Sequence, residues 1–226
     1  GIDLERFDPL QVSAERVIQL SQQWRLPDGV PVVLLPGRLT GWKGQSILIE
    51  ALARLGHKKI RCLLVGSDQG RTGYRRSLEE LSQRLDVENV VHIVGDCRDM
   101  PAAYMLADVV VSASTDPEGF GRVMVEAQAM GRPIIAPDHG ASREVIDHGT
   151  TGWLFPPGDV HMLSERIAHV IRLDEKHRHR IADAGILNAQ ENFSKDKMCS
   201  ETLGVYREIL NEPVSTAGGV WENVAA

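Results

Sequence analysis

Short apolar runs alternate with longer amphipathic stretches along most of this 226-residue chain. Six of the runs have the length of buried strands, and most are rich in β-branched residues, as is typical of strands that helices cover on both faces. They lie at residues 32–35, 60–65, 90–94, 108–114, 133–137 and 152–155. This alternation predicts an α/β fold with a doubly wound, mostly parallel six-stranded sheet.

Helical periodicity fills the intervals between these runs. The pattern predicts helices at residues 14–24, 45–55, 74–85 and 100–106, a crossover helix within 115–131, a short helix at 142–147 that Ser142 caps, and three C-terminal helices at 160–173, 176–192 and 195–210, the last capped by Ser194. We therefore expect a lead-in at residues 1–30, one globular domain at 31–210 and a flexible tail at 211–226.

Residues 115–131, with the sequence TDPEGFGRVMVEAQAMG, form the stretch around which the chain is organised. They follow one predicted strand and precede another, so they contain a loop at the carboxyl end of a strand, where parallel sheets bind ligands. Gly119, Phe120 and Gly121 begin the helix and allow its backbone to approach a ligand. The first N–H groups of the helix can then face an anion or a sugar hydroxyl.

Two carboxylates flank this helix start, Glu118 in the loop and Glu126 two turns into the helix. Glu126 stands among apolar neighbours, where a carboxylate is costly to bury without a partner. The alternative is that Glu126 is an ordinary solvated helix residue. The pattern favours a binding role for both carboxylates.

A second group of polar residues follows the first predicted strand, in the loop PGRLTGWKG at residues 36–44. It combines three glycines with Arg38 and Lys43, a pattern suited to gripping a phosphate with side-chain charge and backbone N–H groups. It lacks the residue order of a P-loop. The alternative is a surface turn with two solvated cations.

The predicted topology brings these residues together, because the loops at the carboxyl ends of parallel strands share one edge of the sheet. We expect Arg38, Lys43, Glu118 and Glu126 to converge there. His139, in the loop after the fifth strand, is a candidate proton carrier, although a single loop histidine is more often a turn residue.

Composition and charge exclude several classes of protein. A hydrophobic content of 42% is enough for one sizeable core. The net charge of −6 argues against a nucleic-acid or anionic-membrane surface, so any phosphate site must be local. Three scattered cysteines, Cys62, Cys97 and Cys199, suggest neither a disulfide framework nor a zinc site and favour the cytoplasm. No apolar run approaches the ~20 residues of a membrane span, and no signal peptide is visible.

Several motifs together resemble the C-terminal domain of retaining GT-B glycosyltransferases of family 4, also called group 1. They are GRL and KG after the first strand, EGFG with a second Glu eight positions after the first, the ADVVVSAS strand, GRPIIA, and the GWLFPPGD segment. The opening GIDLERFDP resembles the hinge into that domain, and the first residue is Gly1 rather than methionine, which suggests a piece of a longer protein. The resemblance covers nearly the whole chain to Leu210.

The resemblance implies a role for each matching residue. Arg38 and Lys43 would hold the donor diphosphate and stabilise it as it leaves, and Glu118 would contact hydroxyls of the transferred sugar. Glu126 would accept hydrogen bonds from the ribose. The other predicted donor-binding residues are the backbone groups of Gly119, Phe120 and Gly121 and a loop near the base that runs from Val94 to Arg98.

The implied function is transfer of a hexose from a UDP- or GDP-linked donor, with retention, to a lipid, polysaccharide or small glycoside. The sequence has no Asp-x-Asp pair, so we expect neither a metal nor another cofactor. Arg38 and Lys43 would stabilise the departing diphosphate instead. The resemblance places the acceptor site in a missing N-terminal domain. Any peripheral membrane association would run through that domain, and the fragment alone should transfer poorly.

Two other functions remain open. A sugar-nucleotide epimerase or a phosphorylase uses the same two-domain fold, although the spaced pair Glu118 and Glu126 favours transfer. A non-catalytic nucleotide-sugar-binding domain is the other alternative. The presence of Arg38, Lys43 and both glutamates weighs against a degenerate scaffold but not against a sensor.

Overall fold

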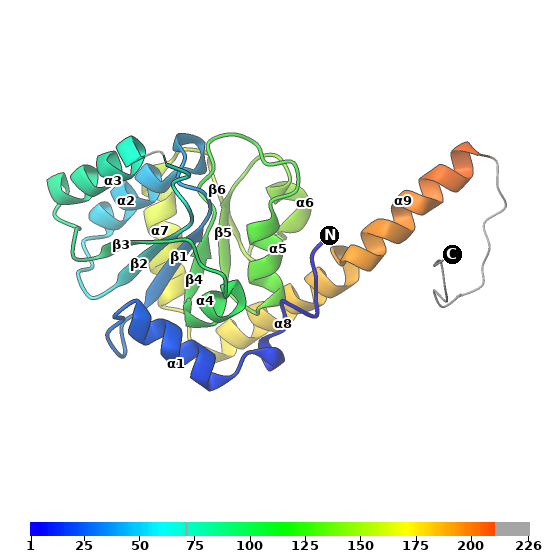
Figure 1. Ribbon diagram of the computed structural model, residues 1–226, viewed down its shortest axis with the longest axis horizontal. Helices are drawn as coiled ribbons and strands as arrows, with labels where there is room; N and C mark the ends of the chain where they lie inside the picture. Colours follow the sequence, from blue (N-terminus) through cyan, green and yellow to red (C-terminus); the bar gives the residue numbers. More distant parts are fainter. Residues whose placement is uncertain (71, 211–226) are drawn as a thin grey trace.

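A six-stranded, all-parallel sheet forms the centre of the protein in a computed structural model that describes residues 1–70 and 72–210 (Figure 1). Its strands are β1 (Val32–Pro36), β2 (Arg61–Val65), β3 (Val91–Gly95), β4 (Val109–Val111), β5 (Ile134–Pro137) and β6 (Trp153–Phe155). Their order is β3-β2-β1-β4-β5-β6. The predicted fold class is confirmed, and the chain reverses its direction of winding between β1 and β4.

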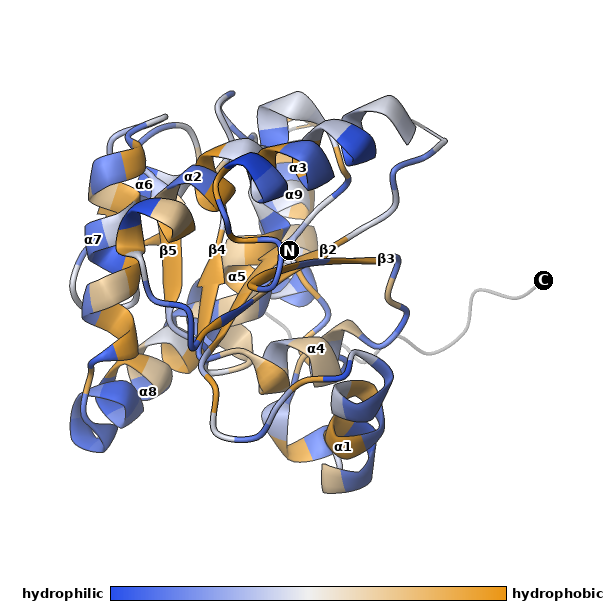
Figure 2. Cartoon of the chain, turned by 90° about the vertical axis from the view of Figure 1, so that its left-hand side faces the viewer, coloured by the Kyte–Doolittle hydropathy of each residue, from blue (hydrophilic) through white to orange (hydrophobic). Residues whose placement is uncertain are grey.

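Alternation along the strands explains why both faces of the sheet are covered. In β1, Val33 and Leu35 belong to one buried cluster, whereas Val32 and Leu34 belong to the cluster on the opposite face. Successive side chains of a strand point to opposite faces, so a strand that is apolar at every position requires a layer of helices on each side. Figure 2 shows the hydrophobic strands enclosed between helices whose outer surfaces are polar.

The helices form those two layers. On one face lie α2 (Gln45–Leu55), α3 (Thr72–Arg84) and α7 (Val160–Ile171), and on the other lie α1 (Ala14–Gln23), α4 (Met100–Leu106) and α5 (Arg122–Ala129). The remaining described helices are α6 (Ser142–Val145), α8 (Glu175–Asn192), α9 (Lys195–Ile209) and the 3-10 turns η1 (Pro9–Gln11) and η2 (Gly41–Lys43). Helix α8 packs along α5, and α9 projects from the rest of the protein (Figure 1).

The N-terminal segment packs against the same face as α4 and α5. Ile2, Phe7, Leu20 and Trp24 are buried in that cluster. The Ile2 backbone N–H also donates to the Phe193 carbonyl at 2.9 Å, which ties the first residues to the end of α8. The boundaries proposed at residues 30 and 31 stay predictions, and the tail proposed at residues 211–226 lies outside the described residues.

Two local predictions were wrong and one is confirmed. The fourth strand is shorter than expected, because the backbone of Thr115 donates to the Trp42 carbonyl at 2.7 Å and draws the chain toward the loop after β1. Ser142 is the first helical residue of α6, whose N-cap is Ala141, since the chain already turns at Gly140 with φ of 53°. Ser194 caps α9 as expected and accepts from the Lys197 backbone N–H.

Candidate functional site

The reversal between β1 and β4 creates the place where an open parallel sheet binds ligands. At such a switch point the loops that follow the two neighbouring strands diverge and leave a crevice outside their carboxyl ends. The loop after β1 carries Arg38 and Lys43, and the loop after β4 carries Glu118. The predicted side chains therefore lie at the carboxyl edge of the sheet, in the loops that follow the two strands flanking the switch point.

Lys43 and Glu118 bridge the two loops directly. The Lys43 Nζ lies 2.8 Å from the Glu118 Oε1, and the two side chains are only 13% and 17% exposed. The Ser114 hydroxyl donates to the same carboxylate oxygen at 2.6 Å. The ammonium also lies 4.4 Å from the centre of the Trp42 ring. Partial burial and these extra contacts hold the pair more firmly than a surface ion pair is held.

Arg38 has a fixed backbone and an exposed side chain. Its carbonyl accepts from the Nε2 of the buried Gln45 at 2.9 Å, and the Gln45 Oε1 in turn accepts from the Tyr74 hydroxyl at 3.2 Å. The guanidinium forms no hydrogen bond with any described residue, so it is available to a ligand at this edge.

The start of α5 presents backbone groups to the same edge. Gly121 is the N-cap, with φ of 70°, and no side chain in the described part of the chain caps the helix there. Its first N–H groups are therefore positioned to receive an anion. The Phe120 ring packs against Phe193, with centroids 6.1 Å apart, and the neighbouring Gly119 is exposed. This region offers backbone rather than side-chain donors.

Glu126 is buried, with 8% of its surface exposed. The Tyr104 hydroxyl donates to its Oε2 at 2.9 Å, and Arg122 approaches its Oε1 at 3.0 Å. Burial raises the pKa of Glu126, while the Tyr104 hydrogen bond and Arg122 oppose that rise. Of the four side chains expected to converge, the structure joins Lys43 and Glu118, and Glu126 has partners of its own. A buried carboxylate with this environment is typical of a functional site.

We expect Glu126→Gln to raise the free energy of unfolding at pH 7 by about 0.5–1 kcal/mol. A carboxyl with a raised folded-state pKa contributes most to stability below its unfolded pKa, and this contribution is lost as the pH rises through the folded pKa. Urea unfolding at pH 7 and pH 5 should show the advantage of the variant shrinking toward acid. The exposed Glu165→Gln on α7 is the control, and a Glu126→Gln protein that is less stable at pH 7 would contradict the prediction.

The loop after β3 contains the residues predicted to lie near a base. Val94 is partly buried against the core, and Arg98 is exposed. The Arg6 Nη2 donates to the Arg98 carbonyl at 3.3 Å, so the N-terminal segment supports this loop.

His139 supports the Glu118 loop. Its Nε2 lies 3.0 Å from the Ser114 carbonyl, which only accepts, so this nitrogen carries the proton and donates. The Ala141 backbone N–H donates to the Glu118 carbonyl at 3.0 Å. These contacts give His139 a structural position, and its proposed role as a proton carrier stays a prediction.

Sequence reasoning missed three residues that the structure places against the predicted ones, Ser114, Tyr104 and Arg6. Ser114 ends an apolar strand, and Tyr104 is a hydroxyl-bearing residue in an apolar helix. Each breaks an apolar pattern with one polar group, and this is the signal that could have revealed Ser114 and Tyr104. Arg6 carries no comparable signal, because charged residues surround it.

Within residues 1–70 and 72–210, no group of three or more His, Cys, Asp or Glu side chains is arranged to hold a metal ion. None of the helices in this part of the chain is long and apolar enough to cross a membrane.

Comparison with known proteins identifies the family. The sequence profile described as "Glycosyl transferases group 1" matches residues 17–187, well over half of the chain. The chain belongs to the group 1 glycosyltransferases. A D-inositol 3-phosphate glycosyltransferase from Xylanimonas cellulosilytica is 31% identical over 211 residues, which cover 92% of this chain and 50% of that protein. This glycosyltransferase chain thus spans about half the length of the curated relatives it matches.

Two crystal structures resemble the group 1 chain closely. A glycosyltransferase from Rickettsia africae gives a TM-score of 0.90 at 32% identity, over 94% of this chain and 56% of that one. Anabaena HepE in complex with UDP-glucose gives a TM-score of 0.81 at 33% identity, over 91% and 56%. The group 1 chain therefore has the Rossmann-like fold of GT-B glycosyltransferases.

Proposed function

We propose that this chain is the C-terminal, donor-binding domain of a retaining glycosyltransferase that transfers a hexose from a UDP-linked donor. The observation that carries the proposal is the ion pair between Lys43 and Glu118, which spans the switch point between β1 and β4 beside the uncapped start of α5. In this proposal Lys43 is the cation for phosphate, Glu118 is the carboxylate for sugar hydroxyls, and the first N–H groups of α5 supply backbone donors at the same edge of the sheet.

Support for a UDP-linked donor comes from a related protein whose ligand is known. HepE, which is 33% identical over 91% of this chain, has been crystallised with UDP-glucose. The β3–α4 loop, with Val94 and Arg98, is the part of this chain that would contact the uracil. A ribose adjoining it would reach Glu126, whose carboxylate can accept from two neighbouring hydroxyls.

The proposed chemistry is electrostatic. Negative charge gathers on the diphosphate as the glycosidic bond breaks, so Arg38 and Lys43 would stabilise the transition state more than the ground state. The N–H groups that follow Gly121 would add partial positive charge on the same anion. We propose that these groups take the place of a metal ion, and that Glu118 positions the transferred hexose through its hydroxyls.

The acceptor site would belong to an N-terminal domain that packs over this crevice. Retention at the anomeric carbon is also part of the proposal. It rests on the resemblance of the EGFG motif and of Glu126 to the pattern of the retaining family. A cytoplasmic location, with any membrane association through the N-terminal domain, completes the proposal.

Calorimetric titration with UDP, GDP, ADP, uridine and UDP-glucose, without metal, tests the proposal. We expect UDP to bind more tightly than GDP or ADP and uridine to bind much more weakly, because the diphosphate contributes charge-assisted hydrogen bonds. UDP affinity should be unchanged by EDTA. Equal weak binding of all five compounds, or none at all, would overturn the donor-site assignment.

A further inference from the structure

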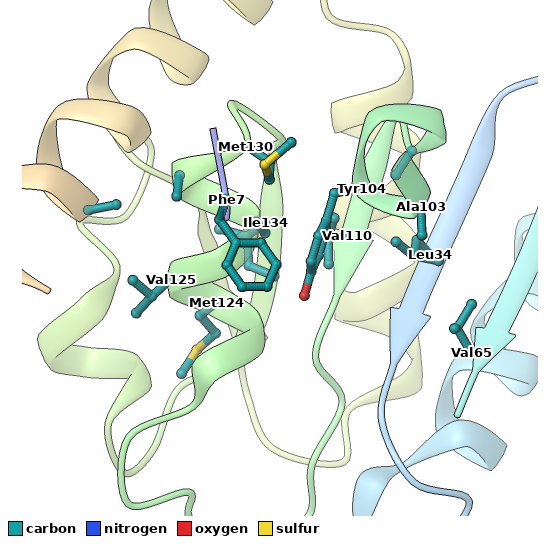
Figure 3. Packing of buried hydrophobic residues seen from close by; sticks show 14 of the residues in the cluster. Phe7, Leu34, Val65, Ala103, Tyr104, Val110, Met124, Val125, Met130 and Ile134 are labelled. Carbon is teal, nitrogen blue, oxygen red and sulfur yellow. The ribbon is translucent and has the colours of Figure 1, made fainter. Parts of the chain in front are cut away.

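Tyr104 is a polar residue at the centre of an apolar cluster. Its side chain on α4 is fully buried, and the Phe7 ring meets it edge-on with centroids 6.1 Å apart (Figure 3). A phenylalanine would fill the same space without bringing a hydroxyl into the core. A buried hydroxyl is costly unless it has a hydrogen-bond partner, so the partner indicates why tyrosine stands here.

That partner is Glu126. Among the described residues, the Tyr104 hydroxyl hydrogen-bonds only with the Glu126 Oε2, at 2.9 Å. Arg122 reaches the other carboxylate oxygen at 3.0 Å, but its side chain is 66% exposed. An exposed arginine holds a carboxylate weakly, because solvent screens the pair and the long side chain remains free to move. The tyrosine ring, packed on all sides, is the rigid anchor.

We propose that Tyr104 is a positioning residue of the donor site, whose hydroxyl holds one Glu126 oxygen so that the other faces the ribose. The inference rests on the proposed function and deepens it. With Oε2 occupied, Oε1 is the oxygen that can exchange Arg122 for a ribose hydroxyl. Without the hydroxyl, the carboxylate rotates among several orientations and binds the ribose less well.

The same hydrogen bond also lowers the pKa of Glu126 and so widens the pH range in which its carboxylate is ionised. The charged and titratable groups that face the carboxylate are Tyr104 on α4, Arg122 on α5 and Arg6 in the N-terminal segment. Burial raises the pKa of Glu126, and the tyrosine hydrogen bond lowers it, as do the charge and the hydrogen bond of Arg122. The pKa of Tyr104 lies well above its usual value, so the hydroxyl keeps its proton and remains a donor. Removing it should raise the pKa of Glu126 further.

The experiment compares UDP with 2′,3′-dideoxyuridine diphosphate, which lacks the ribose hydroxyls, on the full chain. We expect Tyr104→Phe to weaken UDP about 3- to 10-fold and to leave the dideoxy analogue unchanged. The pH at which UDP affinity falls on acidification should be higher in this variant than in the wild type. Tyr206→Phe, which removes an exposed hydroxyl on α9, is the matched control and should behave as the wild type.

Glu126→Gln separates this inference from the proposed function. If that variant loses the preference for UDP over the dideoxy analogue while Tyr104→Phe keeps both the preference and the pH profile, Tyr104 serves packing alone and the inference is overturned. Equal weakening of both ligands by Tyr104→Phe, with the pH profile unmoved, would also overturn it. If Glu126→Gln keeps the preference, the ribose role of Glu126 fails and the inference fails with it.

Discussion

Replacing Lys43 with alanine is expected to weaken UDP binding about 10- to 100-fold, because a charge-assisted hydrogen bond contributes about 1.5–3 kcal/mol. The Lys43 side chain is 13% exposed and is held beside the switch point by Glu118. A cation already positioned there needs little reorganisation to bind a diphosphate, so its loss should appear mainly in affinity. Calorimetric titration of the wild type and the variant with UDP measures the effect.

Two further variants sharpen this measurement. Lys58→Ala removes an exposed lysine that lies just before β2 and forms an ion pair with Asp86. This lysine lies at the edge of the sheet opposite the candidate site, so the variant should not change UDP affinity. Glu118→Gln frees Lys43 and removes a negative charge, so UDP should bind as well as before or better, while UDP-glucose loses the contact to its hexose. Undiminished UDP binding by the Lys43→Ala protein would refute the phosphate role.

Gly44→Ala is expected to lower the free energy of unfolding by about 2–5 kcal/mol. Gly44 begins α2 with φ of 68°, and a Cβ added there would lie 1.9 Å from the Ala113 carbonyl oxygen. The obstacle is backbone, which cannot rotate aside, so the loop after β4 or the start of α2 would have to move. The same movement would separate Lys43 from Glu118. Urea unfolding at neutral pH measures the loss.

Gly56→Ala provides the matched control at the other end of α2. Gly56 has φ of 66°, nearly the same as Gly44, but an added Cβ meets no atom within 4 Å. This variant should lose only the roughly 1–2 kcal/mol of left-handed strain. Equal losses for the two variants would show that the close approach of α2 to the β4 loop contributes nothing.

The local pattern of hydrophobic and polar residues was sufficient to predict most of the fold. The central strands β1 and β4 are apolar at every position because helices cover both faces, and this pattern is visible without any knowledge of contacts. The prediction failed at residues 112–114, where the Thr115 hydrogen bond to Trp42 redirects the chain, and at Ser142, where the turn at Gly140 and the Ala141 hydrogen bond to Glu118 fix the backbone. Such bonds leave no periodic signal in the chain.

The candidate site was predicted only in part. The rule that loops at the carboxyl ends of parallel strands share one edge placed Lys43 and Glu118 near each other across 75 positions of sequence. It did not predict that Glu126 would accept a hydrogen bond from the buried Tyr104. The rule positions loops, whereas the orientation of a side chain depends on the atoms packed around it.

The sequence by itself therefore determined the class of fold, the edge of the sheet where the candidate site lies, and the residue types found there. Hydrophobic periodicity and the position of loops after strands are local properties that a chain carries in its order of residues. Only the tertiary structure decided that Lys43 pairs with Glu118, that Ser114 and Tyr104 hold the two carboxylates, and that Gly44 must lack a side chain. These features depend on separations of a few ångströms between segments that are distant in sequence, and such separations are fixed only when the helices and strands pack.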